Sequence, residues 1–150
     1  VEIALSIDGH GKLNEYLRPG HKWRTIQTNI QKFKELNVKI TNQAVIHNLN
    51  IMHIVEFAKW QEQTFGKLES FNILTIPEHM SIASMSPELK KKAAIKLKEF
   101  LELWPNKSEL VSWALEIMKR DGEPQTLDDM KEKHKKLDEY FGQSFINFNK

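Results

Sequence analysis

The sequence contains no cysteine among its 150 residues. This absence excludes a disulfide framework, and it excludes any zinc or iron–sulfur centre held by thiolates of this chain. No apolar run approaches the ~20 residues needed to cross a bilayer. The first residues also lack the basic region and the small-residue cleavage site of a signal peptide. We therefore expect a cytoplasmic protein with no membrane partner.

Positively and negatively charged residues are spread evenly along the chain. The 22 Lys and Arg residues nearly balance the 20 Asp and Glu residues, for a net charge of +2. The one basic run, Lys90 to Lys92, falls within a predicted helix, where it is typical of a solvated surface. Because nucleic-acid binding usually needs a concentrated basic face, no nucleic-acid partner is predicted.

Short apolar segments and amphipathic segments alternate along the first half of the chain. Residues 2–7, 38–46 and 69–76 are typical of buried strands, and the stretches between them favour helices at about 20–37 and 50–66. Asn50 is expected to cap the second of these helices. This order implies right-handed crossovers and a parallel sheet. From Ser86-Pro87 onward the pattern is helical, with helices predicted at 87–103, after Ser108, and at 126–141.

Three parallel strands are too few to close a barrel, and a parallel sheet needs cover on both faces and at its edges. We therefore predict an α/β fold that is part of a TIM-like (β/α) barrel, whose partner strands lie on another segment. Residues 1–86 would form the barrel portion and residues 87–150 a helical extension packed on it. A small open sheet is the alternative.

Polar residues follow each predicted strand, in the segments 6–9, 46–50 and 74–78, and Arg18 is close in sequence. The carboxyl ends of parallel strands meet at one edge of a sheet, where ligands bind. These groups suit a polar ligand that carries a carboxylate and an amine. They form no hydrolytic triad and predict no catalytic residue or metal site. Asp8-Gly9 as a plain turn and Arg18 as a surface residue are the structural alternatives.

The order of several motifs resembles one enzyme family. Ser6-Ile7-Asp8-Gly9, Glu15-Tyr16-Leu17-Arg18, Gly20, Trp23 and Asn29-Ile30 resemble the fourth strand and following helix of radical S-adenosylmethionine enzymes. The strand before Asn50 and the segment Leu74-Thr75-Ile76-Pro77 are similar to the fifth and sixth strands. The closing segment Lys136-Leu137-Asp138 and Gly142-Gln143-Ser144-Phe145 resembles the end of the twitch (SPASM-like) subgroup. The resemblance spans residues 2–148.

The resemblance implies S-adenosylmethionine as cofactor and assigns residues to it. Ser6 and Arg18 match positions that contact the methionyl carboxylate, for which a guanidinium fork is well suited. Asp8 matches a position near the ribose or the amino group of the cofactor. Leu74 or Ile76 would lie against the adenine, and Asn48 or Asn50 would add polar contacts.

The sequence departs from the family in lacking the C-x3-C-x2-C motif and the first three strands. The [4Fe–4S] cluster would therefore come from an N-terminal half, encoded upstream or on a separate chain, and this chain alone would be inactive. The substrate is not identified, although the subgroup is associated with peptide modification. The alternative function is a small, non-catalytic α/β interaction module that docks a partner through its C-terminal helices.

Overall fold

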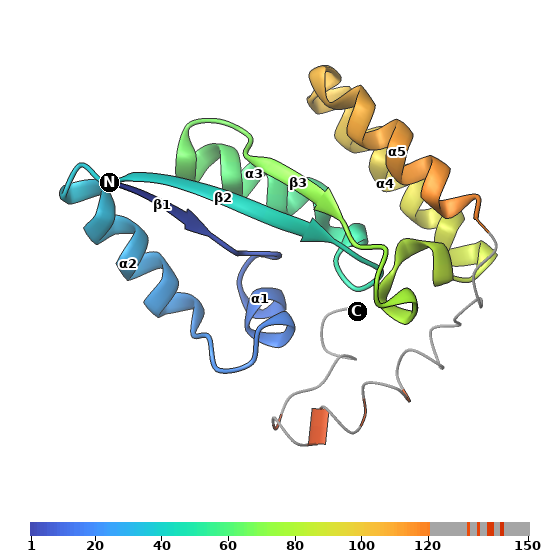
Figure 1. The fold of residues 1–150 in the computed structure, drawn as a ribbon, viewed down its shortest axis with the longest axis horizontal. Coiled ribbons are helices and arrows are strands. Elements are labelled where there is room, and N and C mark those ends of the chain that lie inside the picture. The colour runs from blue at the N-terminus through green and yellow to red at the C-terminus, as the bar shows by residue number, and fades with distance from the viewer. Residues whose placement is uncertain (121–131, 133–134, 136–137, 140–141, 143–150) are drawn as a thin grey trace.

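The computed structural model describes residues 1–120, 132, 135, 138–139 and 142. The chain forms a mixed α/β fold around one parallel sheet with strand order β1-β2-β3 (Figure 1). The strands are β1 at Glu2–Leu5, β2 at Lys39–Ile46 and β3 at Ser70–Ile73. The three predicted strands and their parallel direction are confirmed. β1 and β3 are shorter than predicted, because their last residues leave the sheet as irregular backbone.

Five helices accompany the sheet in the described residues: α1 at Lys12–Leu17, α2 at Trp23–Glu35, α3 at Ile54–Phe65, α4 at Pro87–Leu103 and α5 at Ser108–Met118. α2 connects β1 to β2 and α3 connects β2 to β3, as predicted. α1 was not predicted, because a six-residue helix is too short to display an apolar period. α3 ends at Gly66, which adopts the left-handed conformation (φ 76°) that glycine tolerates.

The predicted helix caps had different outcomes. Asn50 occupies the N-cap position of a 3-10 turn at Ile51–His53 that leads into α3, but its side chain makes no capping bond and donates to the Asp8 and Val45 carbonyls instead. Ser108 is the first residue of α5 rather than its cap. The Ser86 side chain accepts a hydrogen bond from the Leu89 amide, so the predicted cap of α4 is confirmed. The helix predicted at 126–141 falls largely outside the described residues.

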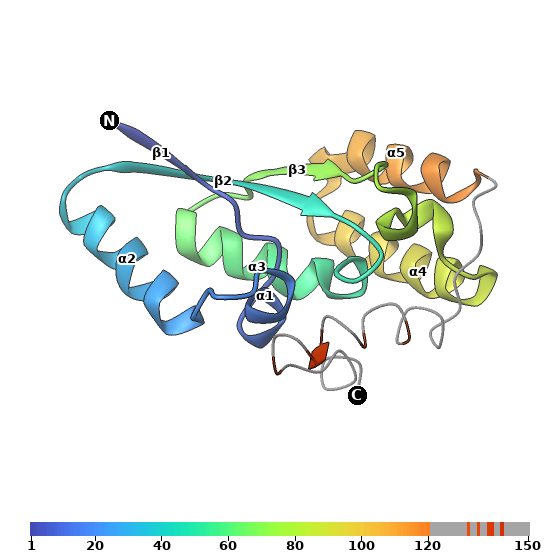
Figure 2. The same cartoon turned by 60° about the horizontal axis from the view of Figure 1, so that its bottom comes forward.

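The two faces of the sheet differ sharply. Figure 2 shows α1, α2 and α3 on one face and no described helix over the other. Side chains directed toward the helices, such as Ala44 and Phe71, belong to the hydrophobic core with Phe57 and Trp60 of α3. We call the other side the bare face. By strand alternation and register it comprises Glu2, Ala4, Lys39, Thr41, Gln43, Val45, Ser70 and Asn72.

α4 and α5 complete the core beside β3. Leu97 and Phe100 of α4 are fully buried, and they share one cluster with Ile46 and Ile73 of the sheet and Ile117 of α5. The Phe100 ring meets Phe71 of β3 edge-to-face, with ring centroids 5.9 Å apart. None of the helices in the described ranges is long and apolar enough to cross a bilayer.

Two leucines of α4 test this packing. Leu97→Ala removes a side chain that is 0% exposed, and we expect it to lower the free energy of unfolding by about 2–5 kcal/mol. Leu103→Ala, on the same helix but 51% exposed, should change it by less than about 1 kcal/mol. Urea unfolding of both variants measures the difference, and equal losses would contradict the packing described for α4.

Candidate functional site

Buried asparagines hold the chain where β1 leaves the sheet. Asn42 of β2 accepts a hydrogen bond from the Ile7 amide (2.9 Å) and donates one to the Ile7 carbonyl (3.0 Å). Asn14 of α1 accepts from the Asp8 amide (3.2 Å), and Asn50 donates to the Asp8 carbonyl (2.9 Å). The backbone has left the ladder here but is still buried, so its polar groups need partners. Side chains supply all four of these partners.

The Asp8 carboxylate is held from two sides. Its Oδ2 accepts from Nε (3.0 Å) and Nη2 (2.7 Å) of Arg18, and its Oδ1 accepts from the Val45 amide (2.8 Å). The Asp8 side chain is 9% exposed, whereas that of Arg18 is 33% exposed. The ion pair therefore fixes Arg18 at the carboxyl edge of the sheet and leaves part of the guanidinium open to solvent.

α1 brings Arg18 back to Asp8. The chain turns at Gly11, and Arg18 follows the last residue of α1, where its amide donates to the Asn14 carbonyl (2.9 Å). Tyr16 on the same helix is buried, and its burial together with the nearby Asp138 raises the pKa of its hydroxyl. Asp138 belongs to the closing segment on which the family resemblance partly rests. The other residues named in that segment, apart from Gly142, lie outside the described residues.

Asn50 and Asn48 belong to two linked networks at the end of β2. Asn50 donates to the Val45 carbonyl (2.7 Å), and its Oδ1 accepts from the His47 amide (2.8 Å). Asn48 bonds to the segment that follows β3. Its side-chain Nδ2 donates to the His79 carbonyl (2.8 Å), and its backbone amide donates to the Met80 carbonyl (3.0 Å). The buried Oδ1 of Asn48 has no hydrogen-bond partner in the described part of the chain.

The remaining predicted residues lie around this network. Ser6 is exposed and lies just after the end of β1, two residues before Asp8. The Leu74 amide extends the β2–β3 ladder through the Ile46 carbonyl (2.8 Å), and its side chain is half-buried. Ile76 is 82% exposed, an unusual state for a large apolar side chain. The structure thus joins Asp8, Arg18 and Asn50 directly, and it places Ser6, Asn48, Leu74 and Ile76 at the same carboxyl edge.

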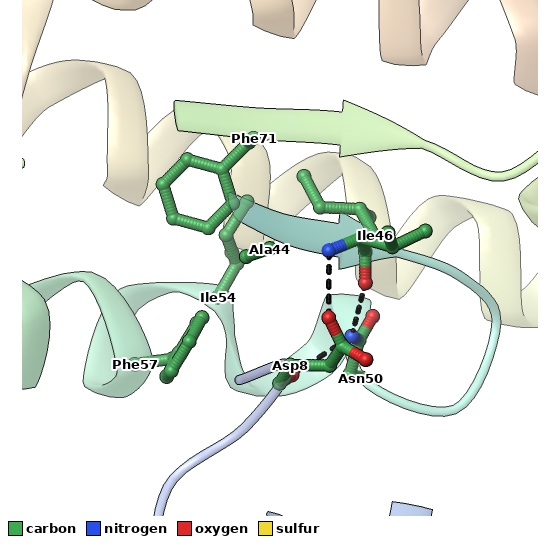
Figure 3. Close-up of a pocket in the computed structure, with 8 residues that line it drawn as sticks. Asp8, Ala44, Ile46, Asn50, Ile54, Phe57 and Phe71 are labelled. Carbon is green, nitrogen blue, oxygen red and sulfur yellow. Dashed lines mark hydrogen bonds between the residues drawn. The ribbon is translucent and has the colours of Figure 1, made fainter. Parts of the chain in front are cut away.

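A small cavity lies beneath the network. Figure 3 shows Asp8 and Asn50 at one end of it and Phe57 and Phe71 toward the other. Its volume of about 10 Å³ is at the threshold for a single water molecule. The cavity is therefore too small to hold a ligand larger than water.

The chemistry available at this edge is recognition of a polar ligand. Nε and Nη2 of Arg18 donate to Asp8. Nη1 donates to none of the described residues, so it is available to donate to an anionic oxygen. A carboxylate is the ligand that a guanidinium recognises best. The described residues contain no group of three or more His, Asp or Glu side chains that could hold a metal ion.

Sequence reasoning missed Asn42 and Asn14. Asn42 carried a usable signal, because asparagine is depleted in strand interiors and here it takes one position in the apolar alternation of Ile40, Ala44 and Ile46. A buried polar residue in a strand implies that some nearby backbone needs a partner. Asn14 gave no such signal, since α1 itself was not predicted.

Replacing Asn42 tests the role of these asparagines. Asn42→Ala leaves the amide and carbonyl of Ile7 buried without partners, which should cost about 2–6 kcal/mol of unfolding free energy, at about 1–3 kcal/mol per group. Asn72→Ala removes an exposed asparagine of β3 and should change stability by less than about 0.5 kcal/mol. Urea unfolding compares the two, and a stable Asn42→Ala variant would contradict the assignment.

Comparison with known proteins finds no relative of this chain. No family model, no curated protein and no solved structure matches the chain. The site is therefore interpreted from its own atoms: an arginine held by a buried carboxylate at the carboxyl edge of a parallel sheet.

Proposed function

We propose that this chain is the C-terminal portion of a radical S-adenosylmethionine enzyme and that it binds the amino-acid and adenosine portions of that cofactor. The observation that carries the proposal is the Asp8–Arg18 pair at the carboxyl edge of the sheet. It presents a preoriented and partly exposed guanidinium. Such a group suits the carboxylate of an amino-acid moiety.

The predicted residues fit the cofactor in distinct roles. Arg18 would donate to the methionyl carboxylate through its available nitrogen, and the exposed Ser6 hydroxyl would add a hydrogen bond. The Asp8 side chain is largely buried and already accepts from Arg18 and from the Val45 amide, so its role here is to position Arg18 rather than to contact the ligand. Ile76, 82% exposed beyond β3, offers an apolar surface for the adenine. Asn48 and Asn50 would hold the strand connections around it.

The polarity of the sheet favours part of a barrel over a doubly wound fold. A doubly wound sheet is covered by helices on both faces, so both faces are apolar. Here one face packs on α2 and α3, and the other carries exposed Gln43, Ser70 and Asn72. A polar face is expected where strands line the interior of a barrel that holds a ligand. We therefore propose that the sheet forms one side of a TIM-like barrel.

The cluster that such enzymes use has to be supplied by another segment. The chain has no cysteine, and iron–sulfur clusters are held by cysteine thiolates. When bound, the cluster supplies the electron for reductive cleavage of the cofactor. The residues present here bind and orient the cofactor, and the isolated chain should be inactive.

Titration with S-adenosylmethionine tests the proposal. The full chain should give a saturable calorimetric or NMR response at millimolar ligand. Arg18→Ala should weaken binding roughly 10- to 100-fold, the value of hydrogen bonds to a charged group. Arg24→Ala, an exposed arginine of α2, is the matched control and should bind as the parent chain does.

Two outcomes would overturn the assignment. One is the absence of any saturable response at millimolar S-adenosylmethionine. The other is equal binding by the Arg18→Ala and Arg24→Ala variants. If the chain binds S-adenosylmethionine, anaerobic mixing with a cysteine-bearing N-terminal half should restore release of 5′-deoxyadenosine. The Arg18→Ala variant should then release less 5′-deoxyadenosine.

An interaction module is the second candidate, favoured by apolar side chains exposed on the C-terminal helices. Ile95 and Leu103 of α4 are 61% and 51% exposed, and Trp113 of α5 is 44% exposed. Exposed apolar groups of this kind can mark a docking surface. If the chain is a monomer that unfolds cooperatively and ignores S-adenosylmethionine, this function is preferred.

A further inference from the structure

Asn14 is a buried polar residue in the middle of a short helix. α1 has six residues, and Gly11 at its start provides no side-chain cap. A helix of this length is not stable by itself in water, so tertiary contacts have to hold it in place. Asn14 is 0% exposed, although asparagine is a poor residue for a helix interior. A buried polar side chain at such a position is expected to serve a hydrogen-bond partner outside the helix.

Asn14 bonds to the backbone of both members of the Asp8–Arg18 ion pair. Its side-chain Oδ1 accepts from the Asp8 amide (3.2 Å), and its backbone carbonyl accepts from the Arg18 amide (2.9 Å). Asp8 and Arg18 are 10 residues apart in the sequence, and Asn14 closes the segment between them into a loop. The Arg18 side chain therefore starts from a backbone that is connected, through Asn14, to the backbone of its own partner.

The acceptor oxygen is the atom of the Asn14 side chain that makes this connection. Because the Asp8 amide is a donor, it requires the oxygen of the carboxamide and not the nitrogen. The buried Nδ2 of Asn14 makes no hydrogen bond to the described residues. A side chain of the same shape that keeps only the oxygen would therefore keep the bond to Asp8.

The ion pair alone does not determine where α1 lies. Arg18 is 33% exposed, and an ion pair that solvent reaches holds a side chain only weakly. Glu15 anchors the other side of α1, because its Oε1 accepts from the Trp23 amide at the start of α2 (2.7 Å). Asn14 makes the corresponding connection toward the sheet, so the direction of the guanidinium depends on it.

We propose that Asn14 is a positioning residue, which holds α1 against Asp8 so that the Arg18 guanidinium is oriented for its ligand. This inference rests on the proposed function for the identity of that ligand, S-adenosylmethionine. Without the Asn14 side chain, Arg18 occupies the binding orientation in only a fraction of the molecules. The apparent affinity for the ligand falls in proportion to that fraction.

Heteronuclear NMR of the arginine side chains in the full chain tests this inference before any ligand is added. The Arg18 Nε–H, which donates to Asp8, should exchange with water more slowly than that of the exposed Arg24. Asn14→Ala should accelerate the Arg18 exchange about tenfold, because the ion pair opens more often. Asn14→Asp, which keeps an acceptor oxygen, should retain most of the protection. Asn14→Ala should also weaken S-adenosylmethionine binding about threefold to tenfold.

Leu97→Ala is the control for general loss of stability. The core cluster described around Leu97 includes no residue of α1, so this variant should exchange at Arg18 and bind S-adenosylmethionine as the parent chain does.

Four outcomes overturn the inference: unchanged Arg18 exchange in Asn14→Ala, equal acceleration in Asn14→Asp, equal acceleration in Leu97→Ala, or loss of the whole fold in Asn14→Ala, which would make the residue structural only. The ligand separates this failure from failure of the proposed function. If the parent chain and Asn14→Ala bind S-adenosylmethionine equally well, the positioning role alone is wrong. If Asn14→Ala accelerates the Arg18 exchange but the parent chain does not bind S-adenosylmethionine, Asn14 positions Arg18 and the proposed function is rejected.

Discussion

The stability of the fold depends on the hydrogen bonds made by the buried backbone that follows β1. Over Ile7 and Asp8 the chain can no longer pair with β2 as a strand, yet it runs through the interior of the fold. Asparagine side chains from β2, from α1 and from the connection after β2 supply the partners. Without them, four buried polar groups would each destabilise the fold. The Asp8 side chain completes the arrangement by accepting from the Val45 amide.

The same constraint positions the candidate site. Because Asp8 is fixed to β2 on one side, its other oxygen faces the end of α1 and captures Arg18. The arginine thereby acquires a defined place without being buried itself. A binding group held by structural hydrogen bonds is more precisely placed than one on a free loop. The ligand-recognition chemistry proposed here is thus a consequence of the way the strand ends are held.

Much of the fold could be predicted because apolar periodicity is a strong signal. The three parallel strands and the two crossover helices follow from it, whereas the start of α4 follows from the capping signal of Ser86 and Pro87. The approach of Asp8, Arg18 and Asn50 was foreseen only in outline, from the rule that strand carboxyl ends share an edge. That Asn50 bonds to two strands rather than to a helix end could not be predicted, because asparagine suits both settings and tertiary contacts decide between them. α1 escaped prediction because it is a single short segment stabilised by its contacts.

The hydrogen bonds that join the two strand connections affect the local opening of the carboxyl edge. Asn48 bonds the connection after β2 to the connection after β3. Asn50 bonds the connection after β2 to Asp8, and its side chain also accepts from the His47 amide. The amides of Ile7, Val45 and Asn48 are therefore protected by partners that depend on one another. Local opening that frees one of them has to release the others, so their hydrogen exchange should be governed by a single cooperative event. The carboxyl edge of the sheet should therefore open as one unit that includes the end of α1, because Asn14 and Arg18 bond to Asp8.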